Sequence, residues 1–175
     1  YKKGWNGINI DLDESSIIEF NKIRKNDYNK QALISDEAGK IKKIYLYHSR
    51  SAINTVSKNL IDSRVNKPKK IITKTSTTLN EIIENSPFKS KKIDFMSIDI
   101  EDHEYEALIN FNFEKYKIDI ICVECNDKSQ KKLEIYNQDI EFIKNSRIYD
   151  LLTKNNYKLI NWVNADLIFA KKDFK

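Results

Sequence analysis

The feature that most constrains the 175-residue sequence is the apolar run at residues 93–100. The run is rich in β-branched and aromatic side chains and is only as long as one strand, which is typical of a strand buried on both faces of a parallel sheet. It leads directly into a dense polar cluster, formed by Asp99, Glu101, Asp102, His103 and Glu104. Because open α/β sheets bind ligands just beyond the carboxyl ends of their strands, we expect the functional site at this junction.

Strand and helix patterns alternate along the rest of the chain. The expected strands cover residues 7–13, 31–35, 42–47, 69–75 and 119–124, and a final hairpin covers 158–163 and 166–171. The expected helices cover residues 14–25, a short segment from Leu79 capped by Thr78, a segment ending near 110, and 146–155. Polar connections are expected at 48–66 and 126–139. This order predicts one α/β domain over residues 1–175 with a mainly parallel sheet, helices on both faces and a C-terminal antiparallel hairpin at the edge.

Composition and charge argue against three classes of function: nucleic-acid binding, membrane contact and a cysteine-based metal or redox site. The net charge is +5, but the lysines are spread over the whole length without a basic stripe interleaved with aromatic residues, so we expect no nucleic-acid binding. No apolar stretch approaches the roughly 20 residues that span a bilayer, and no secretory signal pattern is present, so we expect a cytoplasmic protein without membrane contact. Cys122 and Cys125 lie three apart in a strand pattern and therefore point to opposite faces, which favours two buried thiols over a metal or redox pair.

Several polar residues lie at predicted strand ends. Asp11 is placed so that its carboxylate could accept two hydrogen bonds from the vicinal diol of a ribose, although an acid here could equally cap the next helix. Asp99 and Glu101 lie two apart, so both carboxylates could face one side and hold a cation, act as a base or position a charged substrate; the alternative is that they bind helix N-terminal amides. His103 could accept a proton from a hydroxyl group near neutral pH. Glu124 ends the next strand and is expected beside Asp99.

Five segments resemble one family in their order and spacing. These segments run from Gly4 to Asp11, Leu33 to Asp36, Asn54 to Ser57, Thr78 to Glu81 and Ile93 to Glu104. The chain resembles the FkbM-type S-adenosylmethionine-dependent methyltransferases over nearly its whole length, up to Lys171. The central segment is the most specific part of this resemblance.

The resemblance implies a class I Rossmann-like sheet whose last strand is antiparallel. It also implies S-adenosylmethionine as cofactor, and O-methylation of a sugar or another small hydroxylated metabolite by in-line displacement. The implied cofactor contacts are Asp11 at the ribose, Ser35 and Asp36 near the adenine, and Asp99. The implied catalytic residues are Asp99, Glu101 and His103, with Glu101 or His103 as the base and no metal ligand.

Two departures from the family pattern bear on activity. The family's central motif has the pattern Asp-x-Glu-Gly, whereas Asp102 stands here in place of the glycine; if the position needs a positive φ, the substitution costs stability or activity. The first strand and its glycine-rich loop are expected to be absent, since the glycines are limited to Gly4, Gly7 and Gly39. An inactive methyltransferase-like remnant or binding module therefore remains an alternative. A metal-dependent nuclease, with Asp99 and Glu101 as a DxE motif, is a further one.

Overall fold

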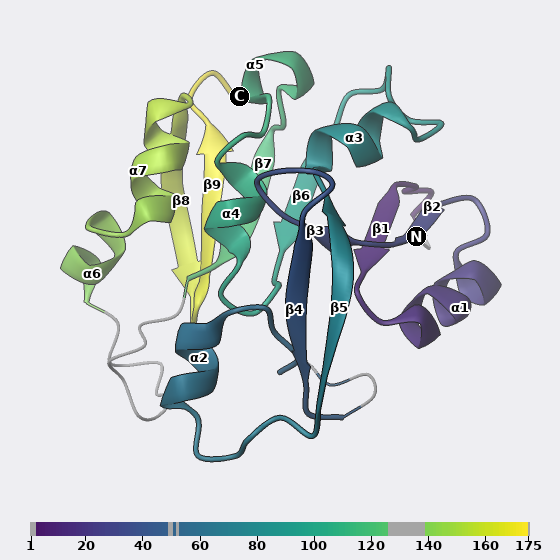
Figure 1. Ribbon diagram of the computed structural model, residues 1–175. Helices are drawn as coiled ribbons and strands as arrows, with labels where there is room; N and C mark the ends of the chain where they lie inside the picture. Colours follow the sequence, from purple (N-terminus) through teal and green to yellow (C-terminus); the bar gives the residue numbers. More distant parts are fainter. Residues whose placement is uncertain (1–2, 49–50, 52, 126–138, 175) are drawn as a thin grey trace.

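The computed structural model describes residues 3–48, 51, 53–125 and 139–174 as an α/β protein with mixed sheets (Figure 1). The strands are β1 (Ile8–Asp11), β2 (Tyr28–Gln31), β3 (Leu33–Ile34), β4 (Ile41–Leu46), β5 (Lys70–Thr77), β6 (Phe95–Ile98), β7 (Ile120–Glu124), β8 (Tyr157–Val163) and β9 (Asp166–Lys171). The helices are α1 (Glu14–Ile23), α2 (Lys58–Ser63), α3 (Leu79–Glu84), α4 (Glu104–Leu108), α5 (Phe113–Tyr116), α6 (Ile140–Lys144) and α7 (Arg147–Lys154). No helix in the described ranges has both the length and the apolar character needed to cross a bilayer.

The described strands form three sheets, ordered β1-β2, β3-β5-β4 and β6-β7-β9-β8. Parallel pairs join β1 to β2, β3 to β5 and β6 to β7. Antiparallel pairs join β4 to β5 and β9 to both of its neighbours. The sheets are thus mixed, and the mainly parallel sheet expected from the sequence is not observed. A strand pattern identifies an extended segment, but the direction of its neighbour depends on pairing between distant residues.

The C-terminal hairpin forms as predicted and lies at one edge of the four-stranded sheet. Asn164 makes the turn with a φ of 57°, a left-handed conformation that asparagine tolerates well. Within the hairpin, β9 pairs with β7 and β8 is the outermost strand. Because β9 is antiparallel to both neighbours, β8 runs in the same direction as β7.

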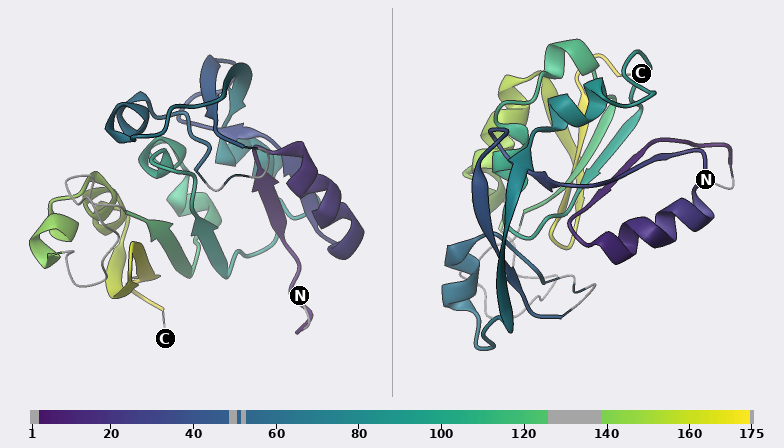
Figure 2. Two further views of the ribbon diagram at one scale, coloured as in Figure 1. Left: turned by 90° about the horizontal axis from the view of Figure 1, so that it is seen from below. Right: turned by 45° about the vertical axis from the view of Figure 1, so that its right-hand side comes forward.

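The main core lies on one face of the four-stranded sheet. Helices α4 and α7 cover this face (Figure 2), where Leu108, Ile121, Leu152 and Phe169 are fully buried. On the opposite face of β6, Phe95 remains 48% exposed. The expected covering of both faces by helices is therefore not seen at this position.

Several short elements escaped the sequence analysis. Strand β2 has the polar sequence Tyr-Asn-Lys-Gln, and α2, α5 and α6 are each only four to six residues long. Such segments are too short to show a period, and tertiary contacts decide their conformation. The predicted loop at 126–139 lies almost entirely outside the described residues.

Candidate functional site

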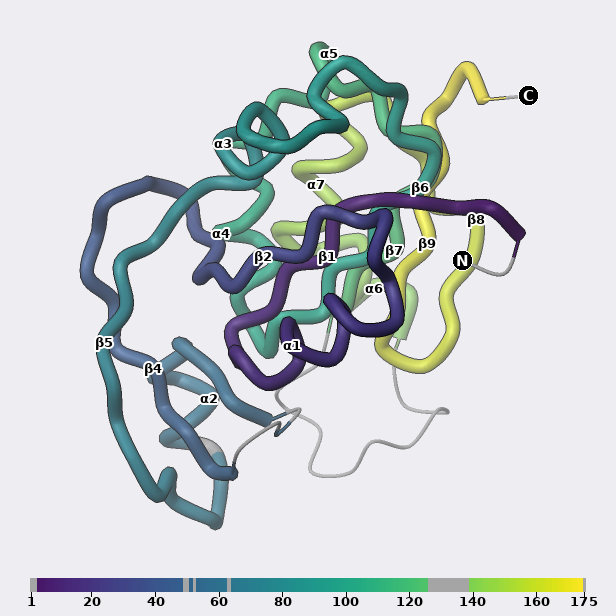
Figure 3. Tube along the Cα trace, turned by 90° about the vertical axis from the view of Figure 1, so that its right-hand side faces the viewer, coloured from purple at the N-terminus to yellow at the C-terminus, as the bar shows by residue number. Residues whose placement is uncertain are grey.

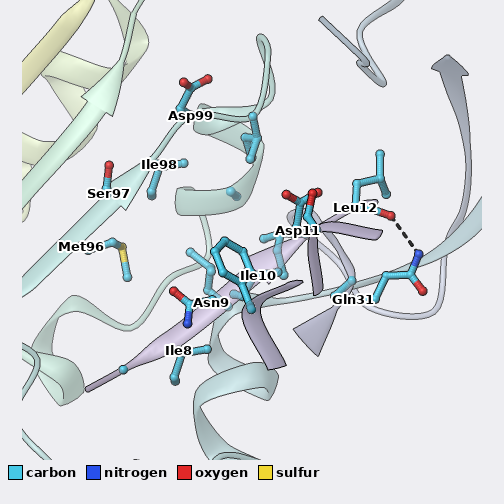
Figure 4. A pocket seen from close by; sticks show the side chains of 18 of the residues that line it. Ile8, Asn9, Ile10, Asp11, Leu12, Gln31, Met96, Ser97, Ile98 and Asp99 are labelled. Atoms are coloured by element: carbon cyan, nitrogen blue, oxygen red, sulfur yellow. Dashed lines mark hydrogen bonds between the residues drawn. The ribbon is translucent and has the colours of Figure 1, made fainter. Parts of the chain in front are cut away.

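A cavity of about 1230 Å³ lies between β1 and β6. In the described part of the chain β1 pairs with β2 and β6 pairs with β7, so the strands on either side of the cavity belong to different sheets. Figure 3 shows β1, β2 and α1 grouped as one small unit, and Figure 4 shows β1 and β6 running in the same direction. Their carboxyl ends, at Asp11 and Asp99, therefore lie toward the same end of the cavity (Figure 4).

Asp11 lines this cavity and does not cap the following helix. The N-cap of α1 is Asp13, whose Oδ1 accepts a hydrogen bond from the Ser15 backbone N–H at 2.8 Å. Asp11 Oδ1 accepts from the Asp13 backbone N–H at 2.8 Å, which fixes the turn after β1. The capping role that the sequence left open for Asp11 thus falls to Asp13, and Asp11 keeps acceptor capacity toward the cavity.

Three carboxylates approach one another beyond the ends of β6 and β7. Asp99, Glu104 and Glu124 each bring one oxygen to within 4.8 Å of the others, which confirms that Asp99 and Glu124 are neighbours. Glu104 is 6% exposed, and its Oε1 accepts from the Ile100 backbone N–H at 2.7 Å. Burial raises the pKa of Glu104 to about 7. A divalent cation would suit such a set, but a proton on Glu104 relieves the same repulsion, so the cluster is not by itself evidence for a metal.

Glu101 does not share one side of the strand with Asp99. Strand β6 ends at Ile98, and Glu101 has a φ of 56°, which breaks the strand alternation on which that expectation rested. The Glu101 carboxylate pairs with Arg64, with Nη2 and Oε2 2.6 Å apart, and its backbone carbonyl accepts from Thr55 Oγ1 at 2.6 Å. Burial raises the pKa of Glu101, although the Arg64 guanidinium acts in the opposite direction.

Asp102 occupies a left-handed position with a φ of 72°. The positive φ that would make the family's glycine the natural residue here is therefore present, and an aspartate adopts it with some strain. In exchange, Asp102 Oδ2 accepts a hydrogen bond from Ser57 Oγ at 2.6 Å. Ser57 also caps α2 by accepting from the Leu60 backbone N–H, so the aspartate ties α2 to the end of β6.

His103 lines the cavity and is 8% exposed. Its Nε2 lies 3.1 Å from Ser35 Oγ, and its Nδ1 lies 3.7 Å from Glu106 Oε2. Burial lowers the pKa of His103, so the imidazole is neutral near pH 7.

Ser35 and Asp36 lie behind His103 rather than along the cavity. Ser35 is 1% exposed, and its hydroxyl donates to Asp36 Oδ1 at 2.6 Å. Lys42 Nζ donates to the same oxygen at 3.1 Å. Together the Ser35 and Lys42 hydrogen bonds hold the pKa of Asp36 at about 2. Neither Ser35 nor Asp36 is among the residues that line the cavity.

The structure thus brings four of the six predicted site residues to one cavity: Asp11, Asp99, Glu101 and His103. Sequence reasoning missed Arg64 as the partner of Glu101, because the polar segment 48–66 showed no element there. The segment Asn54 to Ser57, which carried part of the resemblance, was the available signal, since Thr55 and Ser57 both bond to the turn after β6.

Comparison with known proteins gives one finding. Neither the curated proteins nor the solved structures include a match to this chain. The model of the methyltransferase FkbM domain matches residues 1–159, a range that contains every residue lining the cavity. The chain therefore belongs to the FkbM methyltransferase family.

Proposed function

We propose that the protein transfers a methyl group from S-adenosylmethionine to a hydroxyl oxygen of a sugar or another small hydroxylated metabolite. The observation that carries this proposal is the position of Asp11 and Asp99, at the carboxyl ends of two strands that run in the same direction on either side of one cavity. The family membership supports methyl transfer as the reaction class. The order β6-β7-β9-β8 with an antiparallel β9 supports a Rossmann-like sheet of the class I type. We also propose a cytoplasmic location, with neither membrane nor nucleic acid as a partner.

The cavity suits this cofactor in size and charge. Its volume of about 1230 Å³ lies above the roughly 300–1000 Å³ of typical small-molecule sites, which leaves room for the cofactor together with an acceptor. Asp11 would bind the ribose hydroxyls, because a carboxylate has acceptor capacity beyond its bond to Asp13. Asp99 would face the positively charged sulfonium, which an acidic cavity end favours. The bound cofactor would supply an electrophilic methyl group on that sulfur.

The acceptor hydroxyl must lose its proton to a group of the chain, and His103 suits this role better than Glu101. The Arg64 guanidinium pairs with Glu101 Oε2 at 2.6 Å, and its positive charge opposes protonation of this carboxylate. His103 lines the same cavity as a neutral imidazole, whose unprotonated nitrogen can accept a proton near pH 7. We therefore assign His103 as the base and Glu101 as a residue that shapes the turn.

The nuclease alternative receives little support from this geometry. A DxE motif needs both carboxylates on the same ion, whereas Glu101 pairs with Arg64 and is not among the described carboxylates that cluster around Asp99. The inactive-remnant alternative predicts a fold of this kind without methyl transfer.

Calorimetric titration with S-adenosylhomocysteine tests the proposal. We expect the wild-type chain to bind, and Asp11→Ala to weaken binding by about 1–3 kcal/mol because hydrogen bonds to the ribose are lost. Asp62→Ala, a change at an exposed carboxylate on α2 away from the cavity, is the matched control and should bind like the wild type. No binding at millimolar ligand would refute the proposal. Equal affinity of Asp11→Ala and wild type would remove Asp11 from the site, and binding without transfer to any hydroxylated acceptor would favour the remnant.

A further inference from the structure

Two residues that do not line the cavity are hydrogen-bonded in series to the assigned base. Ser35 Oγ lies 2.6 Å from Asp36 Oδ1 and 3.1 Å from His103 Nε2. Ser35 is only 1% exposed, so its hydroxyl is shielded from solvent. A serine hydroxyl carries one proton and can therefore donate to only one of these two neighbours. The direction of each hydrogen bond follows from which neighbour can donate.

Asp36 can only accept. Its pKa is held at about 2 by the hydrogen bonds from Ser35 and Lys42, so at neutral pH the side chain is a carboxylate without a proton. Lys42 Nζ donates to the same oxygen at 3.1 Å and reinforces this state. The Ser35 proton therefore points to Asp36, and the Ser35 oxygen offers a lone pair to His103. The His103 Nε2 must then carry a proton to make its 3.1 Å contact with Ser35.

We propose that Ser35 and Asp36 are positioning residues that hold neutral His103 as the Nε2–H tautomer, so that Nδ1 is the nitrogen at which the imidazole accepts a proton. The tautomer of a neutral histidine is commonly set by the hydrogen bonds that its ring nitrogens make. Here Ser35 sets the tautomer: its proton is donated to Asp36, so its oxygen can only accept a hydrogen bond from His103. The catalytic meaning of this arrangement rests on the proposed function, whereas the tautomer itself does not.

The Glu106 carboxylate, which lies beside Nδ1, is a group that could favour a proton on Nδ1 instead. Glu106 Oε2 lies 3.7 Å from Nδ1, too far for a hydrogen bond and near enough to stabilise the ring once it is charged. Arg147 Nη2 lies 3.4 Å from the other oxygen of Glu106 and limits how strongly this carboxylate attracts a proton to His103. Within the described residues, Lys42, Asp36 and Asp102 also act electrostatically on the ring. Burial lowers the pKa of His103, so the resting ring is neutral and only one nitrogen is protonated.

Nitrogen-15 NMR of the imidazole rings tests the proposal directly, since protonated and unprotonated ring nitrogens give distinct signals. The chain has two histidines, and His48→Asn leaves His103 as the single imidazole. In that background, near pH 7.5, we expect a protonated Nε2 and an unprotonated Nδ1. Ser35→Ala removes the acceptor for Nε2–H and should give a mixture of both tautomers. Ser76→Ala is the matched control: Ser76 is also buried, at 4% exposure, but donates to the Glu37 carbonyl and should leave the tautomer unchanged.

Asp36→Asn provides a second variant that does not empty a core position, because the Asp36 side chain is 41% exposed. An asparagine amide can donate to Ser35, which frees the serine proton for His103 Nε2, so we expect the population to move toward the Nδ1–H tautomer. A wild-type ring protonated at Nδ1, or an unchanged Nε2–H ring in both Ser35→Ala and Asp36→Asn, would overturn the proposal. The measurement needs no cofactor, so its failure is distinguishable from a failure of the chain to bind S-adenosylhomocysteine.

Discussion

At the residue scale, the turn after β6 carries two consecutive non-glycine residues with positive φ, Glu101 and Asp102. Asp102 has a φ of 72° where the family has glycine, and a left-handed residue with a Cβ costs about 1–2 kcal/mol. Its carboxylate, however, accepts from Ser57 Oγ at 2.6 Å. The hydrogen bond between Asp102 and Ser57, the N-cap residue of α2, therefore offsets part of the backbone strain.

The two contributions can be separated by substitution at position 102. Asp102→Ala removes the hydrogen bond with Ser57 and keeps the strain of the positive φ. Asp102→Gly removes the same hydrogen bond and relieves that strain. We expect Asp102→Gly to be more stable than Asp102→Ala by about 1 kcal/mol in urea unfolding. At the exposed Asp94, whose φ is not positive, the order should reverse because glycine loses more chain entropy on folding. An alanine variant at 102 as stable as the glycine variant would contradict the strain argument.

Glu104 makes stability depend on pH. Burial, with smaller contributions from Asp102 and Asp99, raises its pKa from 4.5 to about 7. Between these values the folded state keeps a proton that the unfolded chain has released, so this contribution is complete below pH 4.5 and is lost as the pH rises toward 7. We expect the unfolding free energy of wild type, relative to Glu104→Gln, to fall by up to about 3 kcal/mol between pH 4.5 and 8 in urea titrations. Parallel stability curves for the two proteins would exclude this role.

Sequence patterns identified local roles, and the order of the strands identified Asp99 and Glu124 as neighbours, but other partners that are distant in the sequence were missed. The capping box of Thr78 and Glu81 was predicted from a spacing of three residues and is observed. The Ser35 contact with His103 joins residues 68 positions apart, and no local pattern specifies such a pair. The cluster from Asp99 to Glu104 located the cavity correctly, but the individual orientations depended on a positive φ at Glu101 that an ordinary strand pattern does not contain.

At the scale of elements, α3 shows how much a terminus can contribute to a short helix. The helix has six residues, too few to be stable alone in water, yet it buries Leu79, Ile82 and Ile83 in the core. Two reciprocal hydrogen bonds cap its N-terminus. Thr78 Oγ1 accepts from the Glu81 backbone N–H, and Glu81 Oε2 accepts from the Thr78 backbone N–H. We expect Thr78→Ala to lower the free energy of unfolding by about 1 kcal/mol in urea experiments, and Thr78→Ser to retain most of it. Equal losses in both variants would assign the effect to packing instead.

The pairing of elements was less predictable than their type. The long strands and the amphipathic helices α1 and α7 were found from periodicity, because each has an apolar stripe of its own. The hairpin lies at the edge of the sheet as expected, but its pattern did not specify which of its two strands pairs with β7. The terminal hairpin thus forms from local turn chemistry at Asn164, while its place depends on the apolar face that β7 offers.

At the scale of the whole molecule, the cavity separates a strongly paired region from a weakly paired one. Strand β7 is hydrogen-bonded to β6 and β9, and its Ile121 and Val123 are fully buried. Strand β1 pairs with β2 in the described residues, and all four of its residues are partly exposed. Local opening should therefore cost far less in the β1–β2 unit than in the four-stranded sheet.

Hydrogen exchange followed by mass spectrometry can measure this difference and connect it to the proposed function. We expect the amides of β7 to exchange most slowly and those of β1 much faster. S-adenosylhomocysteine should slow exchange in β1 and in the turn after β6, because Asp11 and Asp99 would hold the ligand from opposite sides of the cavity. Strand β8, at the far edge of the sheet, serves as the internal control and should not respond. Equal protection of β1 and β7 without ligand would show that local opening costs the same free energy on both sides of the cavity. A ligand effect confined to other segments would place the cofactor elsewhere.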